Sequence, residues 1–131
     1  MMLSFGSDLV MKDSQIYDTQ GRLAGVLSAI GNSAVEMQNV SIERNEVTQG
    51  SILIIENTRS AILNIVRMKA NTGGPFIEVK MTTLSLTNTV MMDADDTFIV
   101  ATQSSLFIHN STFVDGGSFN SLGGGLRCEE C

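Results

Sequence analysis

The sequence predicts an all-β fold, a right-handed parallel β-helix of about five coils with 22–27 residues in each coil. The first observation is a repeat: residues 82–95 (TTLSLTNTVMMDAD) and 104–117 (SSLFIHNSTFVDGG) share one pattern, 22 positions apart. The second is that apolar residues within the pattern alternate with a period of two, which is typical of strands. The third is that the likeness joins segments one fixed step apart, as stacked coils require and a hairpin meander does not.

Earlier segments carry the same pattern, at residues 7–18, 33–44 and, more loosely, 60–71. The apolar residues that begin the five copies are Leu9, Val35, Ile62, Leu84 and Leu106. In the third copy, Asn64 falls where the pattern expects an apolar residue. A shift of one residue, to Leu63 and Ile65, would restore the alternation, and the sequence alone does not choose between these two registers.

A second short apolar run precedes four of the five copies, at residues 26–30, 52–55, 76–79 and 98–101. Ile77 and Ile99, in the last two of these runs, are again 22 positions apart. Each coil therefore contains at least two short strands. Gly, Asn, Asp, Thr and Ser separate the runs, which is the composition expected of turns between strands.

Polar residues recur at one turn position of the repeat. Asp13, Asn39, Asn88 and Asn110 occupy it, and the third copy breaks the series. Because equivalent residues of stacked coils lie on one another, we expect a hydrogen-bonded ladder of these side chains. Asn also tolerates the left-handed backbone that a sharp turn between sheets needs.

The composition bounds the remaining possibilities. The chain has 131 residues, of which 43% are hydrophobic and 17% charged, enough for one domain with a core. Eight Lys and Arg against fourteen Asp and Glu argue against a nucleic-acid partner. No apolar run approaches the ~18 residues that cross a bilayer, so we expect no membrane insertion, and no signal peptide is visible. We place the coils in residues 1–122 and a Gly-rich, Cys-containing end in 123–131 that continues into further coils or a Cys-rich module.

Two stretches carry a resemblance to known proteins. NTGGPFI (71–77) and FNSLGGGLRC (119–128) resemble the Gly-Gly-Ala-Ile and Phe-x-x-Asn repeats of polymorphic outer-membrane proteins and other large surface proteins. The stacked strands resemble the right-handed parallel β-helix of the pectin-lyase-like superfamily. The resemblance implies a solenoid used for adhesion, surface coating or carbohydrate handling, and it brings no active site to this chain.

The acidic residues Asp93, Asp95 and Asp96 are the densest group of carboxylates in the chain. Oxygen ligands at this spacing could bind Ca²⁺, although a charge run in a turn is more often a solvated loop. His109 is the only histidine and is predicted to point away from the apolar column. We expect no catalytic residue, no other metal site and no cofactor.

Two further motifs bear on modification. Asn39 and Asn110 begin N-glycosylation sequons, but both also fall in the predicted ladder, which competes for their amides. Cys128 and Cys131 form a C-x-x-C at the end of the sequence, for which we expect disulfide use rather than free thiols.

These observations predict a non-catalytic structural or adhesive β-helix segment of an extracellular, surface or filament-forming protein. Its expected partners are other copies stacked end to end or further coils of the same chain, with glycans as a further candidate. Two alternatives stay open: a carbohydrate-active β-helix, a polysaccharide lyase or hydrolase whose catalytic coils lie elsewhere, and a glycan-binding module.

Overall fold

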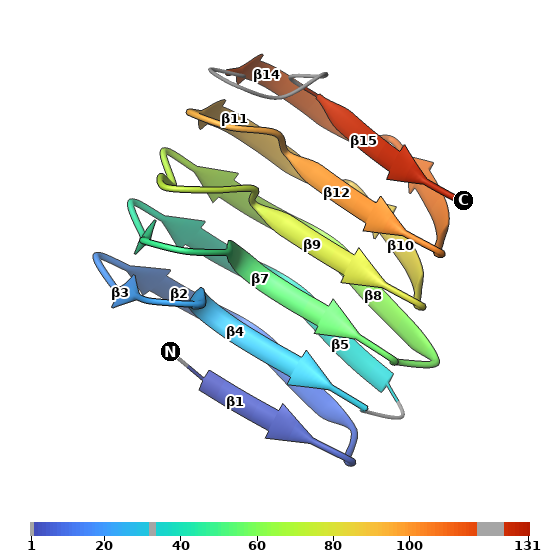
Figure 1. The fold of residues 1–131 in the computed structure, drawn as a ribbon. Coiled ribbons are helices and arrows are strands. Elements are labelled where there is room, and N and C mark those ends of the chain that lie inside the picture. The colour runs from blue at the N-terminus through green and yellow to red at the C-terminus, as the bar shows by residue number, and fades with distance from the viewer. Residues whose placement is uncertain (1, 32–33, 118–124) are drawn as a thin grey trace.

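The computed structural model describes residues 2–31, 34–117 and 125–131. In this part of the chain the protein is a parallel β-solenoid of about four turns without a helix, and therefore without a helix that could cross a membrane (Figure 1). The predicted class of fold is confirmed. The strands are β1 (Met2–Phe5), β2 (Leu9–Tyr17), β3 (Gln20–Gly21), β4 (Ala24–Ile30), β5 (Ala34–Glu43), β6 (Glu46–Val47), β7 (Ser51–Glu56), β8 (Ser60–Lys69), β9 (Ile77–Lys80), β10 (Thr83–Thr87), β11 (Val90–Ala94), β12 (Ile99–Thr102), β13 (Ser105–His109), β14 (Thr112–Gly116) and β15 (Leu126–Glu129).

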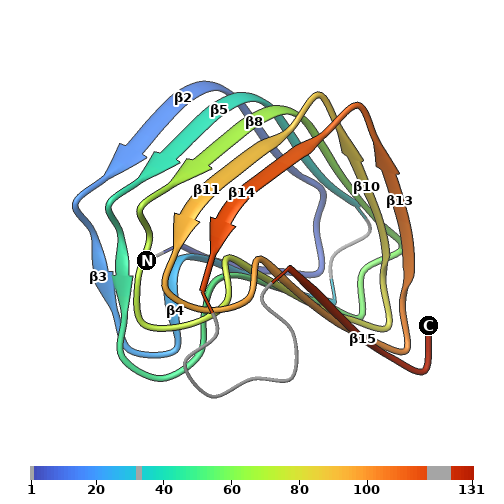
Figure 2. The same ribbon diagram turned by 90° about the horizontal axis from the view of Figure 1, so that it is seen from above.

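Two parallel β-sheets, each built of equivalent strands from successive coils, form the walls of the solenoid. The first has the order β1-β4-β7-β9-β12-β15. The second stacks β2, β5 and β8, after which β10 and β13 continue one half of the wall and β11 and β14 the other. A short third ladder joins β3 to β6. Each strand pairs in parallel with its equivalent in the next coil, so the coils lie on one another around a common interior (Figure 2).

The register places like residues in columns. Leu84 lies opposite Leu106, and Ile77 opposite Ile99, as the repeat predicts. Because side chains alternate across a strand, every second residue faces the interior. The middle of the resulting column in the first sheet is completely buried and consists of Leu27, Leu53, Ile77 and Ile99.

Aromatic packing fills the space beside the first sheet in the last coils. The ring centroids of Phe76 and Phe98 are 5.4 Å apart and the rings meet edge to face. The rings of Phe98 and Phe113 are 5.6 Å apart. Such offset contacts add to the stabilisation that burial of the rings supplies.

The third coil follows neither register considered from the sequence. Ala61, not Ile62, lies opposite both Val35 and Leu84, and Ala61 and Leu63 are fully buried. Ile62 and Ile65 instead point outward, with 46% and 50% of their surfaces exposed. This register keeps Val66 and Met68 in the interior columns beyond the turn, so the larger buried area of the whole coil outweighs the exposure of two isoleucines.

Left-handed backbone recurs at three corners of every coil. All non-Gly residues with positive φ in the described segments belong to one of three columns. The first corner contains Gly6, Gly31, Asn57, Met81, Gln103 and Glu130; the second contains Asp13, Asn39, Ile65, Asn88 and Asn110; the third contains Asp18, Arg44, Ala70, Asp93 and Asp115. Asn and Asp are the non-Gly residues that adopt this conformation most readily, which explains their recurrence.

The Gly-Gly pair within residues 71–77 has a packing reason. Gly73 has a φ of 92°, and a Cβ there would lie 1.7 Å from the carbonyl oxygen of Val47. A Cβ on Gly74 would lie 2.0 Å from the carbonyl oxygen of Gly50. The turn of one coil therefore rests directly on the backbone of the turn before it, at a distance that only glycine permits.

The end of the chain adds a further rung. β15 lies in residues 123–131, which the sequence analysis predicted as a separate Gly-rich and Cys-containing end. It pairs in parallel with β12. Residues 118–124, which contain most of the second Gly-rich motif, lie outside the described residues.

The second corner yields a stability prediction. Ile65 has a φ of 55°, a conformation that costs a β-branched residue roughly 1–2 kcal/mol. Because its column neighbours are Asn and Asp, we expect Ile65→Asn to raise the free energy of unfolding by about 1 kcal/mol. Urea denaturation followed by circular dichroism measures this change.

Ile62→Asn is the matched control, because Ile62 lies in the same strand β8 and is similarly exposed but has no positive φ. It should not stabilise the protein. A loss of stability of the same size in both variants would contradict the assignment of strain to Ile65.

Candidate functional site

The exposed side chains of the second corner form the predicted polar column. Asn39 donates from Nδ2 to Oδ1 of Asp13 at 2.7 Å, and Asn110 donates to Oδ1 of Asn88 at 2.5 Å. Asn88 in turn reaches Oδ1 of Asn64 at 3.5 Å, because Ile65 occupies the corner of the third coil. Each of these three amides thus donates to the coil before it, and the oxygen of Asn88 also accepts from the coil after it.

A second polar ladder, which the sequence analysis missed, is buried beside the third corner. Asn45 and Asn71 are fully buried. Oδ1 of Asn71 accepts hydrogen bonds from the backbone N–H and from Nδ2 of Asn45, both at 3.0 Å, while Nδ2 of Asn71 donates to the carbonyl of Ile42 at 2.9 Å. Asn45 continues the ladder downward, because its Oδ1 accepts from the N–H and Oγ1 of Thr19. The signal was available: Asn45 and Asn71 are 26 positions apart, the spacing of Asp13 and Asn39.

The acidic turn does not gather its carboxylates around one point. Asp93 lies 3.9 Å from Nζ of Lys69. Asp95 accepts hydrogen bonds from the backbone N–H of Gly73 at 3.0 and 3.3 Å. Asp96 accepts from the N–H of the next residue at 2.6 Å. Among the described residues, no group of three or more His, Cys, Asp or Glu side chains is placed to hold a metal ion.

The remaining predicted residues lie on the surface. His109 is exposed on the outer face of β13, in register with Thr87. The sequon residues Asn39 and Asn110 are both exposed, and the amide of each already donates to the coil before it. Cys128 and Cys131 form a disulfide with a Cα–Cα separation of 5.9 Å, at the end of β15.

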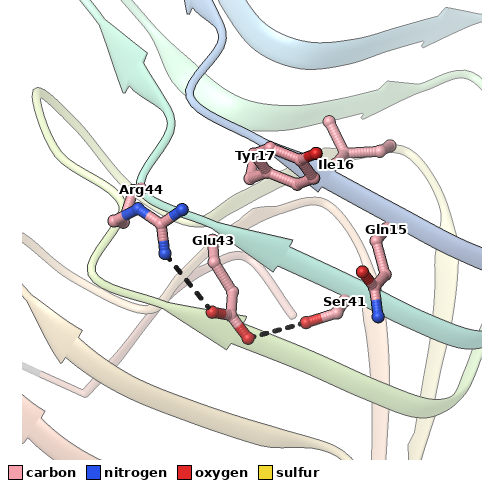
Figure 3. Close-up of a pocket in the computed structure, with 6 residues that line it drawn as sticks. All are labelled: Gln15, Ile16, Tyr17, Ser41, Glu43 and Arg44. Carbon is pink, nitrogen blue, oxygen red and sulfur yellow. Dashed lines mark hydrogen bonds and ion pairs between the residues drawn. The ribbon is translucent and has the colours of Figure 1, made fainter.

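An open polar hollow lies on the outer face of the first two coils (Figure 3). Its lining consists of Gln15, Ile16, Tyr17, Ser41, Glu43 and Arg44. The Ser41 hydroxyl donates to Glu43 at 2.8 Å, and the Arg44 guanidinium lies 3.9 Å from the same carboxylate and 6.0 Å from the centre of the Tyr17 ring.

Arg44 is bound most closely by Asp18, which lies one coil below it. Its Nε and Nη2 donate to the two carboxylate oxygens at 2.9 and 3.2 Å. This side-chain hydrogen bond, followed by the Coulombic attraction of Asp18, raises the pKa of Arg44 above its ordinary value. The charged groups of the hollow are therefore paired with one another and support the stacking of coils.

At the two ends of the solenoid, the described strands have backbone N–H and C=O groups without a partner strand on one side. β1 and β2 at one end, and β13, β14 and β15 at the other, each pair with a strand on one side only within the described residues (Figure 1). Residues of the interior columns are partly uncovered there: Met2 and Leu126 are each 43% exposed and Ile108 is 40% exposed. Unpaired strand edges with apolar side chains are templates for a further strand.

The chain matches no protein-family model, no curated protein and no solved structure. The candidate site is therefore described from geometry alone: among residues 2–31, 34–117 and 125–131, the strands at the two edges of the solenoid pair on one side only.

The buried ladder yields a prediction. Asn71→Ala removes the acceptor of two donors on Asn45, and each unsatisfied buried group costs about 1–3 kcal/mol. We expect the free energy of unfolding to fall by about 2–4 kcal/mol, measured by thermal or urea unfolding. Asn88→Ala, in the exposed ladder, should cost less than about 1 kcal/mol. Equal losses in the two variants would contradict the distinction between the buried and the exposed ladder.

Proposed function

We propose that this chain is a non-catalytic structural segment of an extracellular, surface or filament-forming protein. Its coils extend by docking onto further β-coils at the two open ends. The observation that carries the proposal is the pair of open parallel edges, whose interior columns are partly uncovered.

The interior columns support continuation across such a junction. One column begins at Leu9 and ends at Leu106, and its neighbour begins at Met11 and ends at Ile108. Apolar side chains thus stand at both ends of each column. A coil added at either edge would cover this surface and pair the unpaired backbone groups, which is how solenoid repeats gain most of their stability.

The disulfide favours an extracellular setting. Cys128, within the edge strand β15, is bonded to Cys131 just after it. Disulfides persist mainly in secreted and surface proteins, since the cytosol keeps thiols reduced. The repeated polar ladders likewise suit a scaffold, because they stabilise each rung against the next.

Cysteine cross-linking tests the docking of edges. Val10 and Phe107 begin and end one outward-facing column and are 56% and 62% exposed. If copies stack in register, these positions lie about 4.8 Å apart across the junction, within the range in which a disulfide forms. The variant Val10→Cys/Phe107→Cys should therefore give a series of covalent oligomers on a non-reducing gel after mild oxidation.

Val10→Cys/Ser85→Cys is the control, because Ser85 lies in the same column but one coil inside the edge. It should remain monomeric under the same conditions. Equal amounts of oligomer from both variants would contradict docking in register.

A further inference from the structure

The edge formed by β1 and β2 carries two carboxylates at corner positions, Asp13 in the second corner and Asp18 in the third. Both are exposed. Inside the chain, the coil above supplies each with a donor: Asn39 donates to Asp13 at 2.7 Å, and Arg44 binds Asp18 through two hydrogen bonds. The first coils thus show one residue that bonds well to each carboxylate, an amide on Asp13 and a cation on Asp18. Where the third-corner column instead sets Asp115 on Asp93, Lys69 lies 3.9 Å from Asp93 and balances its charge.

Each carboxylate keeps capacity for another donor. An ionised carboxylate has about four lone-pair sites, and the contacts from the coil above use one at Asp13 and two at Asp18. A coil docked below this edge would place its own corner residues one rung away, about 4.8 Å in the direction of the ladder.

A second copy of this chain would bring poorly matched groups to those positions. At the opposite edge of the solenoid, the second-corner column ends at Asn110. Its Nδ2 already donates to Asn88, so its oxygen faces a coil docked at this edge. The other end of the third corner is Asp115. The junction would therefore set an acceptor against Asp13 and a carboxylate against Asp18, and like charges opposite one another on neighbouring strands are destabilising.

The other positions of the same junction do not share this conflict. The apolar columns continue Leu106 with Leu9 and Ile108 with Met11. The apolar columns therefore favour docking of a second copy, whereas the polar corner residues disfavour it.

We propose that the β1–β2 edge selects a partner β-coil that presents an amide donor to Asp13 and a cation to Asp18. These two carboxylates weaken the docking of a second copy, because the amide of Asn110 already donates to Asn88 and Asp115 is an anion. This inference rests on the proposed function, because it specifies the chemistry of a partner at an edge that docks β-coils.

Two substitutions supply the missing groups within this chain. Asp13→Asn keeps an oxygen for Asn39 and adds an amide donor toward Asn110 of the next copy. Asp115→Arg places a cation opposite Asp18. Arg44 shows that the third corner accepts arginine, because Arg44 and Asp115 share nearly the same backbone conformation, with φ of 53° and 54°.

Sedimentation equilibrium of the 131-residue chain at pH 7 tests the inference. We expect Asp13→Asn/Asp115→Arg to associate with a dissociation constant at least ~10-fold lower than that of the unaltered chain, and the gain to shrink as salt is raised. Asp93→Arg/Asp95→Asn is the control for net charge: it changes the net charge by the same amount as the double variant, and its arginine lies in the same corner column, one coil inside the edge. It should associate no more tightly than the unaltered chain, with circular dichroism checking that each variant is folded.

The outcomes separate the two proposals. Association of the unaltered chain as tight as that of the double variant would overturn this inference and leave edge docking intact. Equal gains from Asp93→Arg/Asp95→Asn would also overturn it, because the effect would then follow net charge. If no chain associates, this inference fails, and cross-linking of the Val10→Cys/Phe107→Cys variant decides whether edge docking fails with it.

Discussion

The structure depends on parallel backbone pairing between each strand and its equivalent in the next coil. This pairing fixes one rung spacing for the whole solenoid, so a residue can lie only on the residue at the same position of the neighbouring coil. Apolar positions become buried columns, such as the one through Leu53 and Ile77, and polar positions become ladders, such as Asn45 on Asn71. A change at one position therefore affects the residues directly above and below it first.

The same constraint explains why the corners contain residues whose positive φ is conformationally unfavourable. A coil must turn three times at fixed positions, and each turn uses a residue with positive φ. Asp and Asn meet this requirement at most positions of the second and third corners, whereas Ile65 and Ala70 do not have side chains suited to it. The third coil accepts these corners because its register buries Leu63 and Met68 in the interior columns. The interior, and not the corners, therefore determines the register.

The fold could be predicted from the sequence because the repeat spacing and the alternation both report directly on stacking. Leu84 and Leu106 illustrate this, since their 22-residue separation is the length of one coil. The third coil could not be placed, because Ala61, Ile62 and Leu63 are all apolar and alternation cannot tell which of them face inward. Asn45 and Asn71 were missed because Asn45 lies just beyond the copy 33–44 while Asn71 ends the copy 60–71, so the register predicted for the third copy did not align them. The acidic turn shows that carboxylates close in sequence need not gather around one point. Asp93 lies near Lys69, whereas Asp95 accepts from the backbone of Gly73.

The central claim, that equivalent strands pair in parallel and in register, can be tested in solution by nuclear Overhauser contacts between the backbones of β10 and β13. The structure predicts contacts that run in one direction, from Thr83 with Ser105 through Leu84 with Leu106 to Thr87 with His109. Contacts that run in opposite directions along the two strands, or no contacts between them, would contradict a parallel β-solenoid.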